Sequence, residues 1–174
     1  MIYVVIGPSG AGKDTLIAGA LRARPDLRSV RRVITRPSAA GGEDFEGVSV
    51  EEFVQRKAAG EFVLDWQAHG LCYGIPHAQV HGPGDVIFNG SRAALMAAGQ
   101  AFPDLRAVLV TAPDNVLAAR LATRGREAED DIRARLARGS FVLPEGIPVT
   151  TVCNDGTPEQ GIARLLAALQ PDRA

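Results

Sequence analysis

Short apolar runs alternate along the chain with stretches whose apolar residues recur at helical spacing. This alternation predicts an α/β fold, with a mainly parallel sheet flanked by crossover helices. The predicted strands are residues 2–6, 28–34, 62–66, 71–75, 85–88, 105–110 and 149–153. The predicted helices are about residues 14–23, 50–59, 91–100, 113–123 and 130–138, with a closing amphipathic helix over about 162–169.

Two segments carry further local signals. Ser49 followed by Glu52 reads as a capping box, and Val50, Phe53 and Val54 predict one apolar helix face that Gly60 ends. The strands over 62–66 and 71–75 turn at His69 and Gly70 and fall outside the strand-helix rhythm. They indicate an inserted lobe over about residues 35–80 of a single domain, residues 1–174.

The amino-acid composition and net charge limit the kinds of molecule that the protein is expected to bind. The 174 residues are 46% hydrophobic, and 19 Lys and Arg stand against 20 Asp and Glu, so no global positive field favours nucleic acid or an acidic membrane. Cys72 and Cys153 match no zinc or redox spacing, which fits a reducing, cytoplasmic compartment. The opening apolar run ends at Gly7 without a preceding basic residue, which indicates neither a signal peptide nor a membrane span. A homodimer is left open.

A glycine-rich segment follows the first predicted strand and precedes a helix, the context of a phosphate-binding loop of the form G-x-x-x-x-G-K. Its backbone N–H groups and the helix N-terminus are expected to hold the phosphates of ATP. Lys13 is expected to act catalytically on the β- and γ-phosphates. The predicted cofactor-binding residues here are Gly7, Pro8, Ser9, Gly10, Ala11, Gly12, Lys13, Asp14 and Thr15.

Asp14 occupies the position where this motif usually has a Ser or Thr that ligates magnesium. A carboxylate is a good ligand for Mg²⁺, so Asp14 is a candidate metal ligand, directly or through water. An acidic residue at a helix start is also favourable without any metal. Both interpretations stay open.

Markers in order along nearly the whole chain resemble the guanylate-kinase-like branch of the P-loop kinases. They are Ile34 to Pro37 with Gly42 and Glu43, Asp65-Trp66 and Tyr73-Gly74, residues 120–138, and Asn154-Asp155. The resemblance implies a P-loop NTPase fold in which the first marker holds the acceptor phosphate. It makes the second an acceptor-binding lobe containing Asp65 and Tyr73, and places Asn154 and Asp155 near the adenine.

Within that branch the chain is more similar to the ribose 1,5-bisphosphate phosphokinases. The similarity rests on Gly12-Lys13-Asp14, residues 66–74, Asn89 to Arg92 and Asn154 to Gly156. It implies ATP-dependent phosphorylation of ribose 1,5-bisphosphate to 5-phosphoribosyl 1-diphosphate during phosphonate breakdown, with a small-molecule sugar bisphosphate as partner.

Two alternatives remain. One is a guanylate or other nucleoside monophosphate kinase. The acceptors that guanine needs are largely missing, since Asn89-Gly-Ser91 replaces an Asp-x-Asp element, but Asp65 retains one acidic group. The other alternative is a non-catalytic guanylate-kinase-like binding module, against which Lys13 and the full glycine loop argue.

A phosphate-monoester acceptor has a second pKa of about 6, so it needs no general base. Arg36 is expected to hold the accepting 1-phosphate, with Arg32 as a second candidate. Asn89, Ser91 and Arg92 are expected to contact hydroxyls or a phosphate, and the rings of Trp66 and Tyr73 to pack.

Six arginines lie between residues 120 and 138, together with four acidic residues. A solvated, salt-bridged helix explains them, but we favour a lid over about 124–135 in which Arg124 and Arg135 close on the phosphates and Arg126 shares that role. Arg120, Arg133 and Arg138 are expected to face solvent. His77 and His81 have metal-ligand spacing without an evident third ligand, so no zinc site is predicted there.

Overall fold

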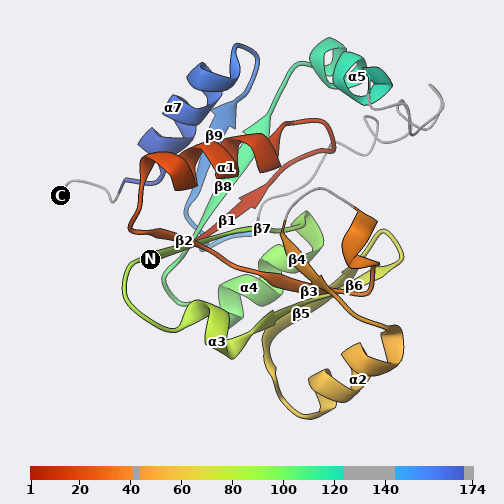
Figure 1. Ribbon diagram of the computed structural model, residues 1–174. Coiled ribbons are helices and arrows are strands. Elements are labelled where there is room, and N and C mark those ends of the chain that lie inside the picture. Colours follow the sequence, from red (N-terminus) through yellow and green to blue (C-terminus); the bar gives the residue numbers. More distant parts are fainter. Residues whose placement is uncertain (41–43, 124–143, 171–174) are drawn as a thin grey trace.

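The computed structural model describes residues 1–40, 44–123 and 144–170, and within them the chain forms two sheets (Figure 1). All neighbouring strands of the first sheet are parallel, and its order is β2-β7-β1-β8-β9. These strands are β1 Ile2–Ile6, β2 Leu27–Ser29, β7 Asp85–Asn89, β8 Leu105–Thr111 and β9 Val149–Cys153. Because β1 lies between β7 and β8, the loop after β1 opens where the order of the strands reverses, which is where such sheets bind ligands.

The second sheet has the order β4-β3-β6-β5. Its strands are β3 Arg32–Ile34, β4 Phe45–Gly47, β5 Phe62–Ala68 and β6 Leu71–Pro76. Only the β3–β4 pair is parallel, and β5 and β6 form a hairpin. In Figure 1 this sheet and helix α2 (Val50–Ala58) form the lower part of the molecule.

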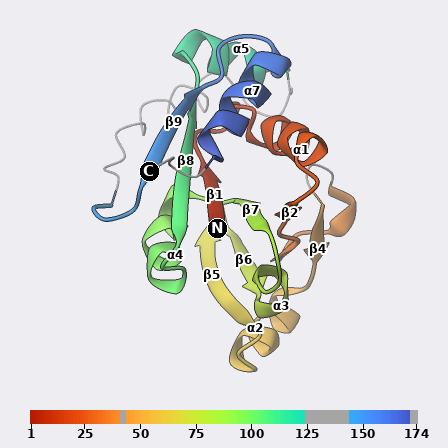
Figure 2. The ribbon, with the colours of Figure 1, turned by 90° about the vertical axis from the view of Figure 1, so that its left-hand side faces the viewer.

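Helices cover both faces of the first sheet. Figure 2 shows α7 (Pro158–Ala168) on one side of β8 and α4 (Leu95–Ala101) on the other, and α1 (Lys13–Ala23) packs against α7. The remaining elements are α3 His77–Val80, α5 Asp114–Thr123 and the 3₁₀ turns η1 Ser38–Ala40 and η2 Arg92–Ala94. None of the helices in these three described stretches combines the length and apolar character that crossing a bilayer requires.

Successive residues of β1 enter two different cores, because side chains alternate across a strand. Tyr3 and Val5 pack with α1 and α7. Val4 and Ile6 pack with α4 and with the second sheet through Leu64. The second core therefore joins the two sheets and fixes the wall on which the site is built.

The predicted α/β class and its mainly parallel sheet are confirmed, but three details were wrong. Residues 28–34 form two strands in different sheets, because the chain leaves the first sheet at Val30, whose N–H donates to the carbonyl of Ile87. Of the predicted apolar face of α2 only Phe53 is buried, whereas Val50 and Val54 are exposed. The helix predicted to start at Ser91 begins as a 3₁₀ turn. The helix predicted over 130–138 lies outside the described residues.

Candidate active site

The loop between β1 and α1 curls because three glycines adopt positive φ angles. Gly7, Gly10 and Gly12 have φ values of 149°, 84° and 87°. A Cβ atom on Gly7 would lie 2.1 Å from the carbonyl oxygen of Val110, and one on Gly12 would lie 2.6 Å from Nδ2 of Asn154. Only glycine fits these positions, and the resulting curve turns backbone N–H groups toward one concavity.

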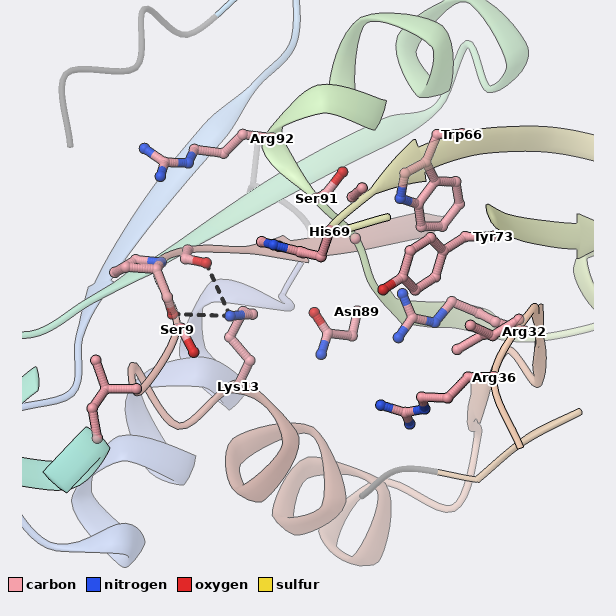
Figure 3. A pocket seen from close by; sticks show the side chains of 16 residues that line it. Ser9, Lys13, Arg32, Arg36, Trp66, His69, Tyr73, Asn89, Ser91 and Arg92 are labelled. Atoms are coloured by element: carbon pink, nitrogen blue, oxygen red, sulfur yellow. Dashed lines mark hydrogen bonds between the residues drawn. The ribbon is translucent and has the colours of Figure 1, made fainter. Parts of the chain in front are cut away.

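Lys13 begins α1 immediately after the loop. Its Nζ donates to the carbonyl oxygens of Gly7 at 2.9 Å and Pro8 at 3.0 Å, so the ammonium group lies over the loop (Figure 3). Lys13 and Ser9 both line the pocket in front of the loop. The role of Lys13 at the phosphates of a nucleotide stays a prediction.

Asn154 supports the loop from behind. Its side chain is buried, and Nδ2 donates to the carbonyl of Ala11 at 2.8 Å, while its backbone N–H donates to Thr111 at 2.7 Å. Asp155 is exposed and pairs with Arg164 at 2.6 Å, which holds the pKa of the Asp155 carboxyl below its usual value. Of the two residues predicted near the adenine, the structure brings only Asn154 to a pocket wall.

A cavity of about 330 Å³ lies behind the loop and is suited to the remainder of a nucleotide. It is lined by Gly10, Gly12, Thr15, Leu16, Arg120, Thr123, Asn154, Gly156 and Pro158. Arg120 was expected to face solvent, which is wrong. Its guanidinium donates to the carbonyls of Asn154 at 2.9 Å and Gly10 at 3.4 Å. The helical spacing of α5 alone does not reveal this, because the partners come from two distant loops.

A second cavity, of about 400 Å³, lies in front of the loop and between the two sheets. Its walls combine the loop, strands β3, β5 and β6, and the end of β7 (Figure 3). Four cationic side chains line it: Lys13, Arg32, Arg36 and Arg92. No Asp or Glu occurs among the described residues of this lining. The cavity is therefore built for an anion.

Arg32 and Arg36 reach this cavity in different ways. Arg32 and Ile34 take alternate positions of β3 and so line the same wall. Arg36 lies in the turn after β3, where its N–H donates to the carbonyl of Ile34 at 2.8 Å, and it also lines the cavity. Arg32 is only 5% exposed, and its guanidinium lies 5.2 Å from the ring centroid of Tyr73 and 5.8 Å from that of Trp66. The guanidinium of Arg32 thus contacts two aromatic rings that stack on each other, and its side chain is buried rather than exposed on the surface.

The structure does not bring Asp65 to the cavity in front of the loop. Trp66 lines the cavity, and Asp65, its neighbour in β5, pairs with Lys57 of α2 at 2.5 Å. Successive side chains of a strand point to opposite faces, so one of the two neighbours must turn away. Tyr73, in contrast, does reach the cavity: its ring lines the wall and stacks on the ring of Trp66.

The three residues predicted at the end of β7 all line this cavity. Asn89 also contacts the phosphate loop, since its Nδ2 donates to Oδ1 of Asp14 at 2.7 Å. Ser91 accepts a hydrogen bond from the N–H of Ala94 at 3.2 Å and so caps η2. The predicted lid residues Arg124, Arg126 and Arg135, with the marker residues Gly42 and Glu43, lie outside the described part of the chain.

These features together define a P-loop kinase fold of the guanylate kinase type. The guanylate kinase of Anaplasma phagocytophilum superposes with a TM-score of 0.68 at 17% identity, covering 99% of this chain and 87% of that one. A gluconokinase of Sinorhizobium meliloti gives a TM-score of 0.54 at 16% identity, covering 96% and 90%. At these identities the likeness shows the fold alone.

Sequence relatives give the particular family. The ribose 1,5-bisphosphate phosphokinase of Ruegeria sp. is 48% identical over 177 residues, covering 99% of this chain and 93% of the relative. That of Agrobacterium fabrum is 49% identical, covering 97% and 96%. No protein-family model matches. The chain belongs to the ribose 1,5-bisphosphate phosphokinase family.

Longer relatives also contain this unit. A bifunctional ribose 1,5-bisphosphokinase-thymidine phosphorylase of Cupriavidus necator is 45% identical over 172 residues. The match covers 97% of this chain but only 29% of that protein.

Asn154→Asp should weaken ATP binding at least about tenfold and lower the free energy of unfolding by about 1–3 kcal/mol. The change is nearly isosteric, but it replaces the donor to Ala11 with a buried acceptor that faces a carbonyl. Calorimetric ATP titration and urea denaturation measure the two effects. Asn115→Asp, on the exposed face of α5, is the matched control, and equal behaviour of the two variants would contradict the role of Asn154.

Proposed function

We propose that this protein transfers the γ-phosphoryl group of ATP to the C1 phosphate of ribose 1,5-bisphosphate, giving ADP and 5-phosphoribosyl 1-diphosphate. The names of its relatives support this activity. The observation that carries the proposal is the charge of the acceptor cavity, where four cationic side chains and no described carboxylate line the wall beside the phosphate loop. A sugar with two phosphates is the complementary ligand.

In the proposed reaction an oxygen of the C1 phosphate forms a bond to the γ-phosphorus, and the bond from that phosphorus to the bridging oxygen of ADP breaks. The accepting phosphate is already mostly a dianion at neutral pH, so no side chain has to remove a proton. The protein supplies position and positive charge instead. This fits a cavity that contains arginines rather than a His-Asp pair.

Different residues would hold the two substrates of this reaction. Lys13 and the loop N–H groups hold the β- and γ-phosphates, and Arg36 holds the accepting phosphate on the facing wall. Arg124 and Arg135 stay as the predicted lid that excludes water from the transfer. In this proposal the cavity behind the loop takes the rest of the nucleotide, and the transferring phosphate meets the acceptor in front of the loop, beside Lys13.

The carboxylate of Asp14 is a suitable ligand for a magnesium ion, and it lies next to the residue proposed to hold the phosphates. Its exposed carboxylate follows Lys13 at the start of α1, and the amide of Asn89 orients one of its oxygens. No group of three or more potential metal ligands occurs in the described stretches, so the protein would supply few ligands and phosphates and water the others. When bound, Mg²⁺ neutralises charge on the transferring phosphates.

The guanylate kinase alternative finds no carboxylate for the base among the described residues that line the cavity. Guanine presents N–H donors that need acceptors, but Asp65 pairs with Lys57 away from the cavity. Asn89 donates its amide N–H to Asp14 and keeps only a neutral carbonyl oxygen as an acceptor. A cytoplasmic location and a place in phosphonate breakdown belong to the same proposal, and both described cysteines are free thiols, as a reducing compartment allows.

The proposal is tested by ATP consumption of the purified protein with ribose 1,5-bisphosphate and with GMP in parallel. We expect turnover with the sugar bisphosphate, none with GMP, and loss of at least about a hundredfold in Lys13→Ala, because that variant removes the charge on the transferring phosphates. Preference for GMP would overturn the proposal. Absence of ATP binding would instead favour a non-catalytic binding module.

Arg36→Ala should raise the KM for the sugar bisphosphate at least about tenfold and leave the KM for ATP within about threefold, because a charge-assisted contact is lost on the acceptor side only. Steady-state kinetics with each substrate varied in turn gives both values. Arg31→Ala is the matched control, since Arg31 is exposed and pairs with Asp44 at 3.2 Å. Equal losses for both substrates would undo the assignment of Arg36.

Asp14→Ser should raise the Mg²⁺ concentration for half-maximal activity by about tenfold and weaken Mg²⁺-dependent ATP binding, because a hard carboxylate ligand is replaced by a neutral hydroxyl. Activity against Mg²⁺ and calorimetric titration with ATP are the two readouts. Asp114→Ser is the control, because Asp114 is an acidic residue in the first turn of α5. An unchanged metal requirement would mean that Asp14 only stabilises the start of α1.

A further inference from the structure

The proposed substrate carries two phosphates, of which only the one at C1 reacts, so the 5-phosphate needs a place of its own. This question rests on the proposed function. The reacting phosphate must lie beside Lys13, on the part of the cavity that Asn89 and Arg36 also border (Figure 3). The 5-phosphate must therefore lie against another wall of the cavity. That wall can be recognised by hydrogen-bond donors that are available to a ligand.

Trp66 offers one such donor. It is only 7% exposed, and its Nε1 is buried without a hydrogen-bond partner among the described residues. Its ring stacks on Tyr73 with centroids 5.2 Å apart and planes 5° from parallel, which leaves the N–H edge to the side. In Figure 3 this edge is turned toward the part of the cavity where Ser91 and His69 lie. Buried indole N–H groups usually have a partner, and no described residue provides one here, so this N–H is available to a ligand atom.

His69 lies at the mouth of the same part of the cavity. It is the one non-glycine residue of the described stretches with a positive φ, 53°, and it forms the turn between β5 and β6 with Gly70 at φ 72°. Asn and Gly are the residues that such two-residue turns favour. The histidine in this position brings a ring with N–H donors to the cavity wall, where Figure 3 shows it pointing inward.

Ser91 completes the group from the other sheet. Its Oγ accepts the N–H of Ala94 at 3.2 Å, so the hydroxyl hydrogen can still be donated to a ligand. Strand β5 packs against η2, which brings the segment of Ser91 beside the strand that carries Trp66. Three donors from two sheets thus border one end of a cavity whose described lining has no carboxylate.

We propose that Trp66, His69 and Ser91 form a second anion subsite that binds the 5-phosphate, while Lys13 and Arg36 serve the reacting end. The subsite recognises a phosphate monoester on a sugar and takes no part in bond making. It sets specificity, because an acceptor that lacks the second phosphate leaves the buried indole N–H without a partner.

Trp66 is the single tryptophan of the chain, so its fluorescence reports directly on this subsite. The first experiment titrates the protein with ribose 5-phosphate, which has only the remote phosphate, and with ribose as the phosphate-free control. We expect a saturable change in emission with ribose 5-phosphate and none with ribose. No response to ribose 5-phosphate would overturn the subsite.

Variants then assign the phosphate to one end of the cavity. His69→Asn, which keeps a residue suited to positive φ, should raise the dissociation constant for ribose 5-phosphate about tenfold. His77→Asn is the matched control, because His77 is exposed and outside the cavity lining, and it should bind as the unmodified protein does. A response that His69→Asn leaves unchanged and Arg36→Ala abolishes would overturn the assignment.

Kinetics with two acceptors separates the subsite from the proposed function. His69→Asn and Trp66→Phe should lower kcat/KM for ribose 1,5-bisphosphate about tenfold but change that for ribose 1-phosphate less than about twofold. Equal losses with both acceptors would overturn the subsite. Fluorescence binding of ribose 5-phosphate that is sensitive to His69→Asn, in a protein that does not turn over the bisphosphate, would support the subsite and overturn the proposed function alone.

Discussion

The buried amide of Asn154 is the contact on which the site depends. It joins the end of β9 to the phosphate loop through Ala11, and its backbone N–H bonds to the end of β8 through Thr111. A loop that turns its N–H groups toward phosphate has its carbonyls pointing elsewhere, and a buried carbonyl needs a donor. Asn154 provides that donor, and Arg120 bonds to the carbonyl of Asn154 itself. The loop is thus held from behind, so its front stays available for phosphates.

The two sheets contribute different parts of the site around this loop. The parallel sheet carries the loop and the cavity behind it, and the second sheet carries the wall of the cavity in front. Arg32 on β3 and Arg36 in the turn that follows it both line this cavity. Arg56 of α2 lies outside that lining, between Glu46 at 2.7 Å and Glu61 at 2.5 Å, and holds the pKa of the Glu46 carboxyl below its usual value. Arg56 thus serves the packing of α2 against its neighbours, whereas Lys13, Arg32, Arg36 and Arg92 give the cavity wall its positive charge.

Local signals explain what the sequence could predict. The glycine-rich loop is a local motif between a strand and a helix, and the turn at His69 and Gly70 lies between two runs of alternating residues. The positions of both turns are confirmed, and phosphate binding by the loop stays a prediction. Contacts between segments that are far apart in the sequence cannot be read from a local pattern. The pattern over residues 28–34 is that of one strand, and only the competing sheet reveals the break at Val30. Arg120 likewise resembles any solvated helix arginine until the ends of two loops are placed beside it.

The charge distribution also explains how one fold can exclude the acceptor of its structural neighbours. The chain as a whole is nearly neutral, at a net charge of -1, yet the described cavity lining contains cations and no carboxylate. A guanine base placed there would find no carboxylate among the described lining residues to accept from its N–H groups, and each donor left without an acceptor costs free energy. Specificity is a difference between affinities, so removing acceptors rejects the purine as effectively as added cations favour the bisphosphate. Under the proposed function, the pairing of Asp65 with Lys57 outside the cavity would add to this selectivity, because an inward carboxylate would repel the second phosphate and offer the purine an acceptor.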